Sequence, residues 1–123
     1  TALEYAAFAA NKGSVAGAAM EAELLAATDL ESARNKFAAI LNRKGRMAVI
    51  DTVITYNTWA RAEANHGCHV EAGIRYQEAL SLDPDNACTN ALYGQWLHQN
   101  DLSQAETGRQ LQIKAQSLGL EME

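Results

Sequence analysis

Alanine is the feature that most constrains what this chain can fold into. It supplies 24 of the 123 residues, and hydrophobic residues together make up 48% of the chain. Small apolar side chains at intervals of three and four residues favour closely packed helices over the pleated surface of a sheet. No segment alternates between polar and apolar residues for long enough to indicate a strand. The sequence therefore predicts an all-α fold.

Turn signals divide this periodic sequence into about seven short helices. The interruptions are Lys12-Gly13, Thr28-Asp29, Lys44-Gly45, His66-Gly67, Asp83-Pro84 and Asn100-Asp101. The predicted helices span residues 2–12, 15–27, 30–43, 47–66, 69–82, 87–99 and 102–118.

Several residues at the predicted helix ends are suited to capping. Asp29, Asp101 and one of Asp85 and Asn86 are candidate N-caps, because their side chains can accept hydrogen bonds from free backbone N–H groups. Gly119 can close the last helix in a left-handed conformation.

Length and charge narrow the classes of function. The chain is long enough for one domain and too short for two ordinary ones. Its net charge of −5 repels a phosphate backbone, so nucleic acid is not an expected partner. No run of 18 apolar residues occurs, so we expect a soluble protein without membrane insertion. Its compartment stays open between the cytoplasm and, if a signal peptide was removed, the periplasm.

Eight residues between positions 53 and 86 stand at characteristic spacings. They are Tyr56, Trp59, Ala60, Gly67, Ala72, Tyr76, Ala79 and Pro84. In type and spacing they resemble the tetratricopeptide repeat (TPR), a helical hairpin whose motif has aromatic, small, glycine and proline positions in this order. The chain departs from the pattern at Glu63, where the family usually has an aromatic residue. The resemblance implies an α-solenoid, in which antiparallel helical hairpins stack on one another.

Packing gives the pattern a physical meaning. Ala60, Ala72 and Ala79 are small enough for two helices to cross closely, and Trp59 and Tyr76 fill the space between that pair and its neighbours. The interpretation therefore requires the three alanines to be buried.

Two other segments resemble further repeats, so we expect about three TPR-like repeats in a single domain, 1–123. The later segment carries Leu92, Tyr93, Gly94, Trp96, Asp101, Leu102 and Ala105, with Arg109 in place of an aromatic residue. The earlier segment carries Asp29, Leu30, Ala33, Phe37 and Ile40, without the closing proline. The repeats are placed at about 14–47, 48–86 and 87–120, with a capping helix at 1–13. The wider spacing from Ala33 to Ala72 than from Ala72 to Ala105 predicts one longer helix at 47–66.

The TPR resemblance also implies a concave groove lined by the first helix of each hairpin. It places Asn57, Arg61 and Asn65 on one stripe, and Asn90 or Ala91, Gln95 and His98 on the next. Spacing by three or four residues puts each set on one helix face independently of the family. Amide side chains there can hold an extended peptide by its backbone, and Arg61 could bind a carboxylate. The alternative is that these are ordinary solvated polar residues.

The turn around Gly67 contains His66, Cys68 and His69, which are potential zinc ligands. Because no fourth ligand lies nearby in the sequence, we interpret the cluster as structural and predict no metal. Cys68 and Cys88 are separated by a predicted helix of roughly 20 Å. A disulfide requires Cα atoms within about 7 Å, so we predict that the two cysteines are unpaired with each other.

No catalytic motif or cofactor-binding loop occurs, so we expect no enzyme activity and no cofactor. The leading hypothesis is a non-catalytic scaffold that binds a protein or peptide in the groove. One alternative is a small secretion-type chaperone, because residues 102–108 resemble the final helix of such proteins. Residues 90–97 resemble repeats of pilus-assembly proteins, which is a related alternative. Another is a structural module that forms homo-oligomers through its end helices.

Overall fold

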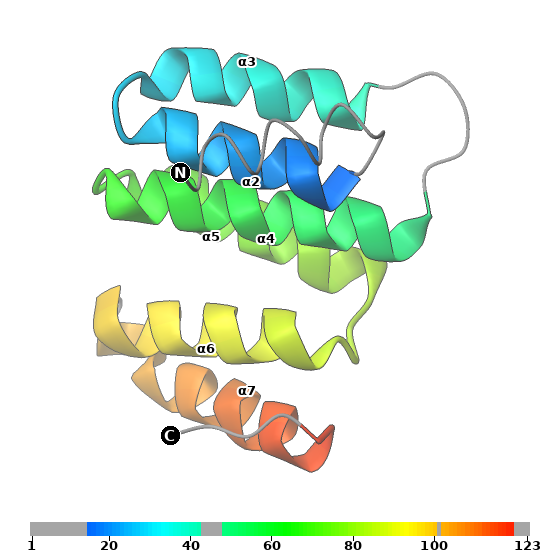
Figure 1. The fold of residues 1–123 in the computed structure, drawn as a ribbon. Coiled ribbons are helices and arrows are strands. Elements are labelled where there is room, and N and C mark those ends of the chain that lie inside the picture. Colours follow the sequence, from blue (N-terminus) through cyan, green and yellow to red (C-terminus); the bar gives the residue numbers. More distant parts are fainter. Residues whose placement is uncertain (1–14, 43–47, 101, 120–123) are drawn as a thin grey trace.

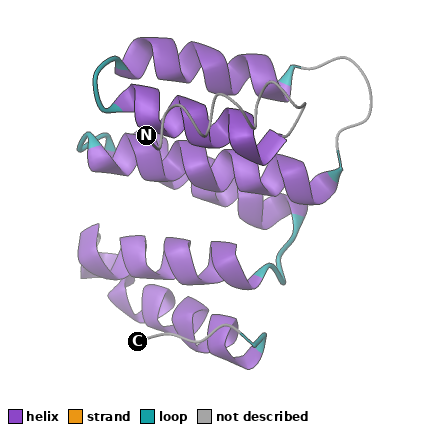
Figure 2. Ribbon diagram, in the orientation of Figure 1, coloured by secondary structure: helices purple, strands orange, loops and turns teal. Residues whose placement is uncertain are grey.

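The structure, a computed structural model, describes residues 15–42, 48–100 and 102–119. These residues form six α-helices and one short 3-10 helix, and no strand occurs among them (Figure 2). The elements are α2 (Val15–Ala26), α3 (Leu30–Leu41), α4 (Val49–Asn65), α5 (His69–Leu82), α6 (Ala87–Asn100), η1 (Leu102–Gln104) and α7 (Ala105–Ser117). The predicted all-α fold is confirmed.

The predicted helix boundaries agree closely with the observed ones, with one difference in type. The predicted helix at 102–118 begins as the 3-10 turn η1, and the α-helix proper starts at Ala105. The longer helix expected at 47–66 is α4, which has 17 residues and is the longest of the described helices. The helix and cap predicted at 2–12 and 1–13 lie outside the described residues.

Adjacent helices pack as three pairs, α2 with α3, α4 with α5 and α6 with α7, stacked in chain order (Figure 1). α4 also contacts α2 and α3, and α6 contacts α5, so each pair packs against the next. The described part of the chain therefore has the layered arrangement of a helical repeat protein.

The predicted caps explain where several helices begin and end. The Asp29 side chain accepts a hydrogen bond from the Ser32 N–H at 3.0 Å, and Asn86 Oδ1 accepts one from the Thr89 N–H at 2.9 Å. Gly119 has a φ of +99°, the left-handed conformation expected after a helix. The candidate cap Asp101 lies outside the described residues.

Two hydrophobic clusters hold the helices together, and α4 contributes to both. The first joins α2, α3 and α4, with the Phe37 and Trp59 rings stacked at 5.5 Å. The second joins α4, α5, α6 and α7. Ala60, Ala72 and Ala79 are all fully buried, which confirms the burial that their spacing predicted.

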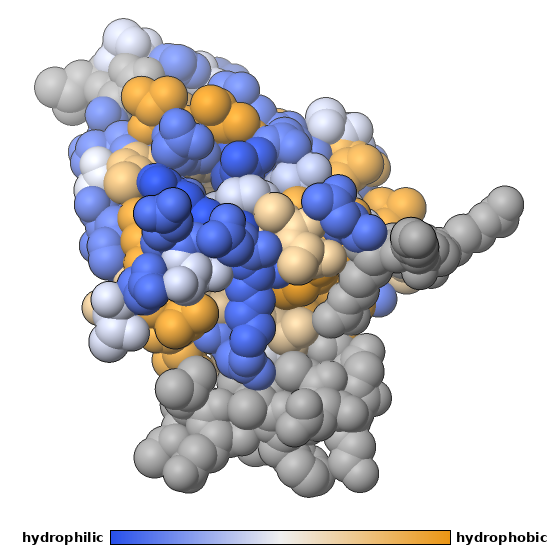
Figure 3. All heavy atoms as spheres, turned by 90° about the horizontal axis from the view of Figure 1, so that it is seen from above, coloured by the Kyte–Doolittle hydropathy of each residue, from blue (hydrophilic) through white to orange (hydrophobic). Residues whose placement is uncertain are grey.

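The surface of α3 differs from its packed side. Ala33, Phe37 and Ile40 are buried against α2 and α4. On the face seen from above, where α3 lies, hydrophilic side chains predominate and apolar ones form smaller separate areas (Figure 3).

Within the described residues, no helix combines the length and apolar character needed to cross a membrane.

Candidate functional site

A groove lies between α4 and α6 and contains two cavities. Their volumes are about 300 and 250 Å³, and Arg61 of α4 and Leu92 of α6 line both of them. The larger cavity is lined from the C-terminal halves of the two helices and is termed the polar cavity. The smaller one is lined from their N-terminal halves and is termed the apolar cavity. Because the two share these lining residues, they are neighbours along the groove.

The pairs of helices are joined by side chains of different size. Alanines such as Ala22, Ala26 and Ala62 belong to the cluster that joins α2 to α4, and they let these helices pack closely. α4 touches α6 directly at only a few points. Between the second and third pairs lies a stack of aromatic rings, with Tyr76 5.8 Å from Tyr93 and Trp96 6.0 Å from Tyr93. A further cavity of about 320 Å³ lies between α2 and α4, and Ala26 and Ala62 are among its lining residues.

The polar cavity is lined mainly by side chains that can donate and accept hydrogen bonds. Asn65 and Gln95 are exposed and line it from opposite sides, together with His69 of α5. Tyr76 lies on its inner side, and burial raises the pKa of this phenol to about 12. Trp96 also lines the cavity, and its buried Nε1–H has no hydrogen-bond partner.

The apolar cavity is lined largely by aliphatic side chains. Val53 is fully buried, Ile54 is half-buried and Ile50 is 51% exposed, so the aliphatic lining extends from the interior to the surface. The Thr58 hydroxyl also lines this cavity, but it donates to the Ile54 carbonyl oxygen of its own helix at 2.7 Å.

Asn57 lines the apolar cavity, and its side-chain oxygen is an acceptor without a partner. Its Nδ2 donates to Thr89 Oγ1 at 2.8 Å, while Thr89 Oγ1 donates to Asn86 Oδ1 at 3.2 Å. Asn86 Oδ1 is itself fixed as an acceptor by the Thr89 backbone N–H. Since the hydroxyl has only one hydrogen, it can only accept from Asn57, and this sets the orientation of the Asn57 amide. Asn57 Oδ1 is left buried without a partner, in a residue only 6% exposed.

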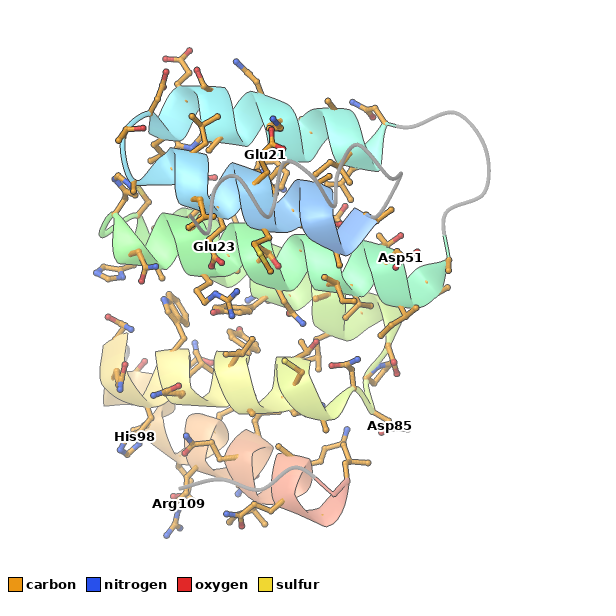
Figure 4. All side chains as sticks on the ribbon, in the orientation of Figure 1. Glu21, Glu23, Asp51, Asp85, His98 and Arg109 are labelled. Carbon is orange, nitrogen blue, oxygen red and sulfur yellow. The ribbon has the colours of Figure 1, made fainter. Side chains whose placement is uncertain are left out.

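Arg61 stands where the two cavities meet and is already paired. Its Nε and Nη2 both donate to the carboxylate of Glu23, the latter at 2.9 Å, and Glu23 projects from α2 toward α4 (Figure 4). The hydrogen bond to Glu23 raises the pKa of the guanidinium above its ordinary value. A ligand carboxylate would therefore have to displace Glu23 to reach Arg61.

The structure brings four of the six predicted groove residues to the cavities: Asn57, Arg61, Asn65 and Gln95. Asn90 is fully buried, and its Nδ2 donates to the carbonyl oxygens of Pro84 and Asn86 at 2.9 and 2.8 Å. That amide therefore ties the α5–α6 turn to α6 and does not line either cavity.

His98, the sixth predicted groove residue, lies near the C-terminal end of α6 on the side of α7, away from α4 (Figure 4). A Cβ added to Gly108 of α7 would lie 2.9 Å from the backbone nitrogen of His98, so the His98 backbone packs against α7. His98 lines neither cavity.

The residues around Gly67 contact three different parts of the molecule. His66 Nε2 contacts the Ala26 carbonyl oxygen, Cys68 Sγ accepts a hydrogen bond from Arg34 Nη2 at 3.6 Å, and His69 lines the polar cavity. Among the residues that the structure describes, no three histidine, cysteine, aspartate or glutamate side chains are grouped to hold a metal ion. Cys68 and Cys88 are both free thiols, as predicted.

Sequence reasoning missed the apolar lining of the groove. Leu92 and Trp96 were interpreted only as parts of the repeat pattern, and Ile54 was not singled out. The available signal was their position on one helix face: Leu92 precedes Gln95 by three residues, and Trp96 follows Leu92 by four.

Comparison of the chain with protein-family models, with curated proteins and with solved structures finds no match in any of the three.

Proposed function

We propose that this chain is a helical-repeat protein of the TPR type that binds an extended peptide segment of a partner protein in the groove between α4 and α6, without catalysing a reaction. The observation that carries the proposal is the pair of neighbouring polar and apolar cavities, with volumes of about 300 and 250 Å³. A ligand that occupies both cavities passes over Arg61 and Leu92.

The TPR assignment is supported by packing details beyond the helix count. The described helices form three stacked pairs, and the alanines at positions 60, 72 and 79 are buried at helix crossings. Trp59 stacks on Phe37 of the preceding pair, and Tyr76 stacks on Tyr93 of the following pair. These aromatic residues fill the space between pairs, which is the role that the motif implies for them.

The chemistry of the groove fits an extended peptide better than a compact small molecule. An extended peptide presents side chains and backbone amide groups along its length. Asn65 and Gln95 each offer a donor and an acceptor, which can pair with backbone amides in the polar cavity. The apolar cavity offers space for a side chain next to them.

A peptide-selection experiment tests the proposal. Peptides of about 12 residues are selected from a random displayed library on the immobilised chain, and their affinity is measured by fluorescence anisotropy. We expect Gln95→Ala to weaken binding about 2- to 10-fold, the effect of losing one hydrogen bond. The matched control is Gln116→Ala, because Gln116 is also an exposed helical glutamine but lies on α7 outside both cavities.

The control variant should bind like the wild type. If the library yields no binding peptide, or if the selected peptides respond equally to the two substitutions, the groove between α4 and α6 is not the binding site.

A further inference from the structure

Resting on the proposed function, we infer that the apolar cavity is a specificity pocket for an uncharged aliphatic side chain of the peptide. In the same inference, Asn57 Oδ1 accepts a hydrogen bond from a backbone N–H of the ligand next to that side chain. The pairing of a largely aliphatic pocket with one unpaired acceptor defines the ligand chemistry.

The acceptor is the first argument. Asn57 Oδ1 is buried and unpaired, although most buried polar atoms in proteins have a partner. The bonds from Asn57 to Thr89 and from Thr89 to Asn86 fix which side-chain atom of Asn57 is the oxygen, and this oxygen is the acceptor without a partner. A ligand that satisfies this site must bring a donor, and a peptide backbone N–H is such a donor.

The lining is the second argument. Ile50, Val53, Ile54 and Leu92 supply aliphatic surface, and no carboxylate lines the cavity. The one cation there, Arg61, is already paired with Glu23. A charged ligand side chain would lose its hydration without gaining an opposite charge, whereas an aliphatic one loses only unfavourable contact with water.

Two neighbouring residues at the start of α4 provide a matched test of the pocket. Ile50 is 51% exposed and lines the cavity, whereas Val49 is 57% exposed and does not. Replacing either by aspartate puts a carboxylate in the first turn of α4, where the helix dipole favours it, so the effects on folding are similar. Using the peptides selected from the random library, we expect Ile50→Asp to weaken binding at least 10-fold and Val49→Asp less than 2-fold.

Peptide chemistry tests the acceptor. Each backbone nitrogen of the selected peptide is methylated in turn, and binding is measured to the wild type and to Asn57→Leu, whose fold is checked by circular dichroism. We expect methylation at one nitrogen beside an aliphatic residue to weaken binding to the wild type at least 5-fold. The same methylation should change binding to Asn57→Leu less than 2-fold, because the acceptor is already gone. Equal losses on both proteins would overturn the hydrogen bond to Asn57.

The outcomes separate this inference from the proposed function. If selected peptides depend on Gln95 but carry charged residues as their consensus, or bind Ile50→Asp as well as Val49→Asp, the pocket is overturned while the groove stands. If no peptide binds, or if binding is insensitive to Gln95→Ala, the proposed function fails and this inference fails with it.

Discussion

At the scale of single residues, Glu63 is a buried carboxylate that links two helices of the stack. Its side chain is only 1% exposed, although carboxylates are rarely buried unless paired. Arg34 of α3 donates to it through Nε at 2.8 Å and through Nη2 at 2.7 Å, and Trp59 Nε1 donates at 3.0 Å. The Glu63 carboxylate therefore joins α3 to α4 by hydrogen bonds, next to the stacked rings of Phe37 and Trp59.

This arrangement predicts that Glu63→Gln lowers the free energy of unfolding by about 1–3 kcal/mol at pH 7, because Arg34 and Trp59 lose a charged acceptor. Burial raises the pKa of Glu63, but the hydrogen bonds from Arg34 and Trp59 outweigh it, and the net pKa is lowered. The carboxylate therefore stabilises the fold above its unfolded-state pKa of about 4.3. That stabilisation is lost as the pH falls through the lower folded-state pKa.

Urea denaturation at a series of pH values measures this difference. The gap between wild type and Glu63→Gln should narrow as the pH falls below about 4, and Glu31→Gln, at an exposed position on α3, should change stability by less than about 1 kcal/mol. A gap that stays constant from pH 7 to pH 3 would show that the charge of Glu63 does not stabilise the fold.

At the scale of elements, the crossing of α6 and α7 depends on two glycines. A Cβ added to Gly94 would lie 2.6 Å from the Gly108 carbonyl oxygen, and one added to Gly108 would lie 2.5 Å from the Gly94 carbonyl oxygen. Real Cβ atoms do not approach backbone so closely, so the two helices are in backbone contact at this point. Leu97 and Leu111 pack beside the contact in the second hydrophobic cluster.

Gly108→Ala should therefore destabilise the protein by about 1–3 kcal/mol through overpacking. Helix propensity alone would predict a change in stability of the opposite sign, because alanine is favoured over glycine by up to about 1 kcal/mol inside a helix. Thermal or urea unfolding measures the change, with Thr107→Ala as the control because Thr107 is exposed on the same helix. A variant as stable as the wild type would mean that α6 and α7 do not cross at this contact.

The elements themselves were largely predictable from the sequence, because their limits are local. Asp29, Asn86 and Gly119 act at their own helix ends, and three- and four-residue spacing identifies a helix face. The crossing at Gly108 was not predicted, because which helix faces approach most closely depends on packing between pairs.

The candidate site was predictable only in part, for a related reason. Asn65 and Gln95 were found because an exposed amide on the correct helix face lines the groove directly. The burial of Asn90 depends on how the turn at Pro84 folds back on α6, and the place of His98 depends on where α7 packs. Neither can be inferred from spacing along one helix.

At the scale of the whole molecule, the pairs of helices are joined by different kinds of side chain. Alanines join α2 closely to α4, while the aromatic stack of Tyr76, Tyr93 and Trp96 separates the second pair from the third. The three pairs can be followed from top to bottom in Figure 1. Two rings of this stack, Tyr76 and Trp96, line the polar cavity.

The most direct test of this account is an NMR titration of the full ¹⁵N-labelled chain with a peptide selected on it. The account predicts that the largest backbone amide shifts occur around Arg61, Leu92 and Gln95, with little change along the exposed side of α3. The account would be contradicted if the largest amide shifts occurred on α3 or on the outer side of α7 while the residues that line the two cavities were unchanged.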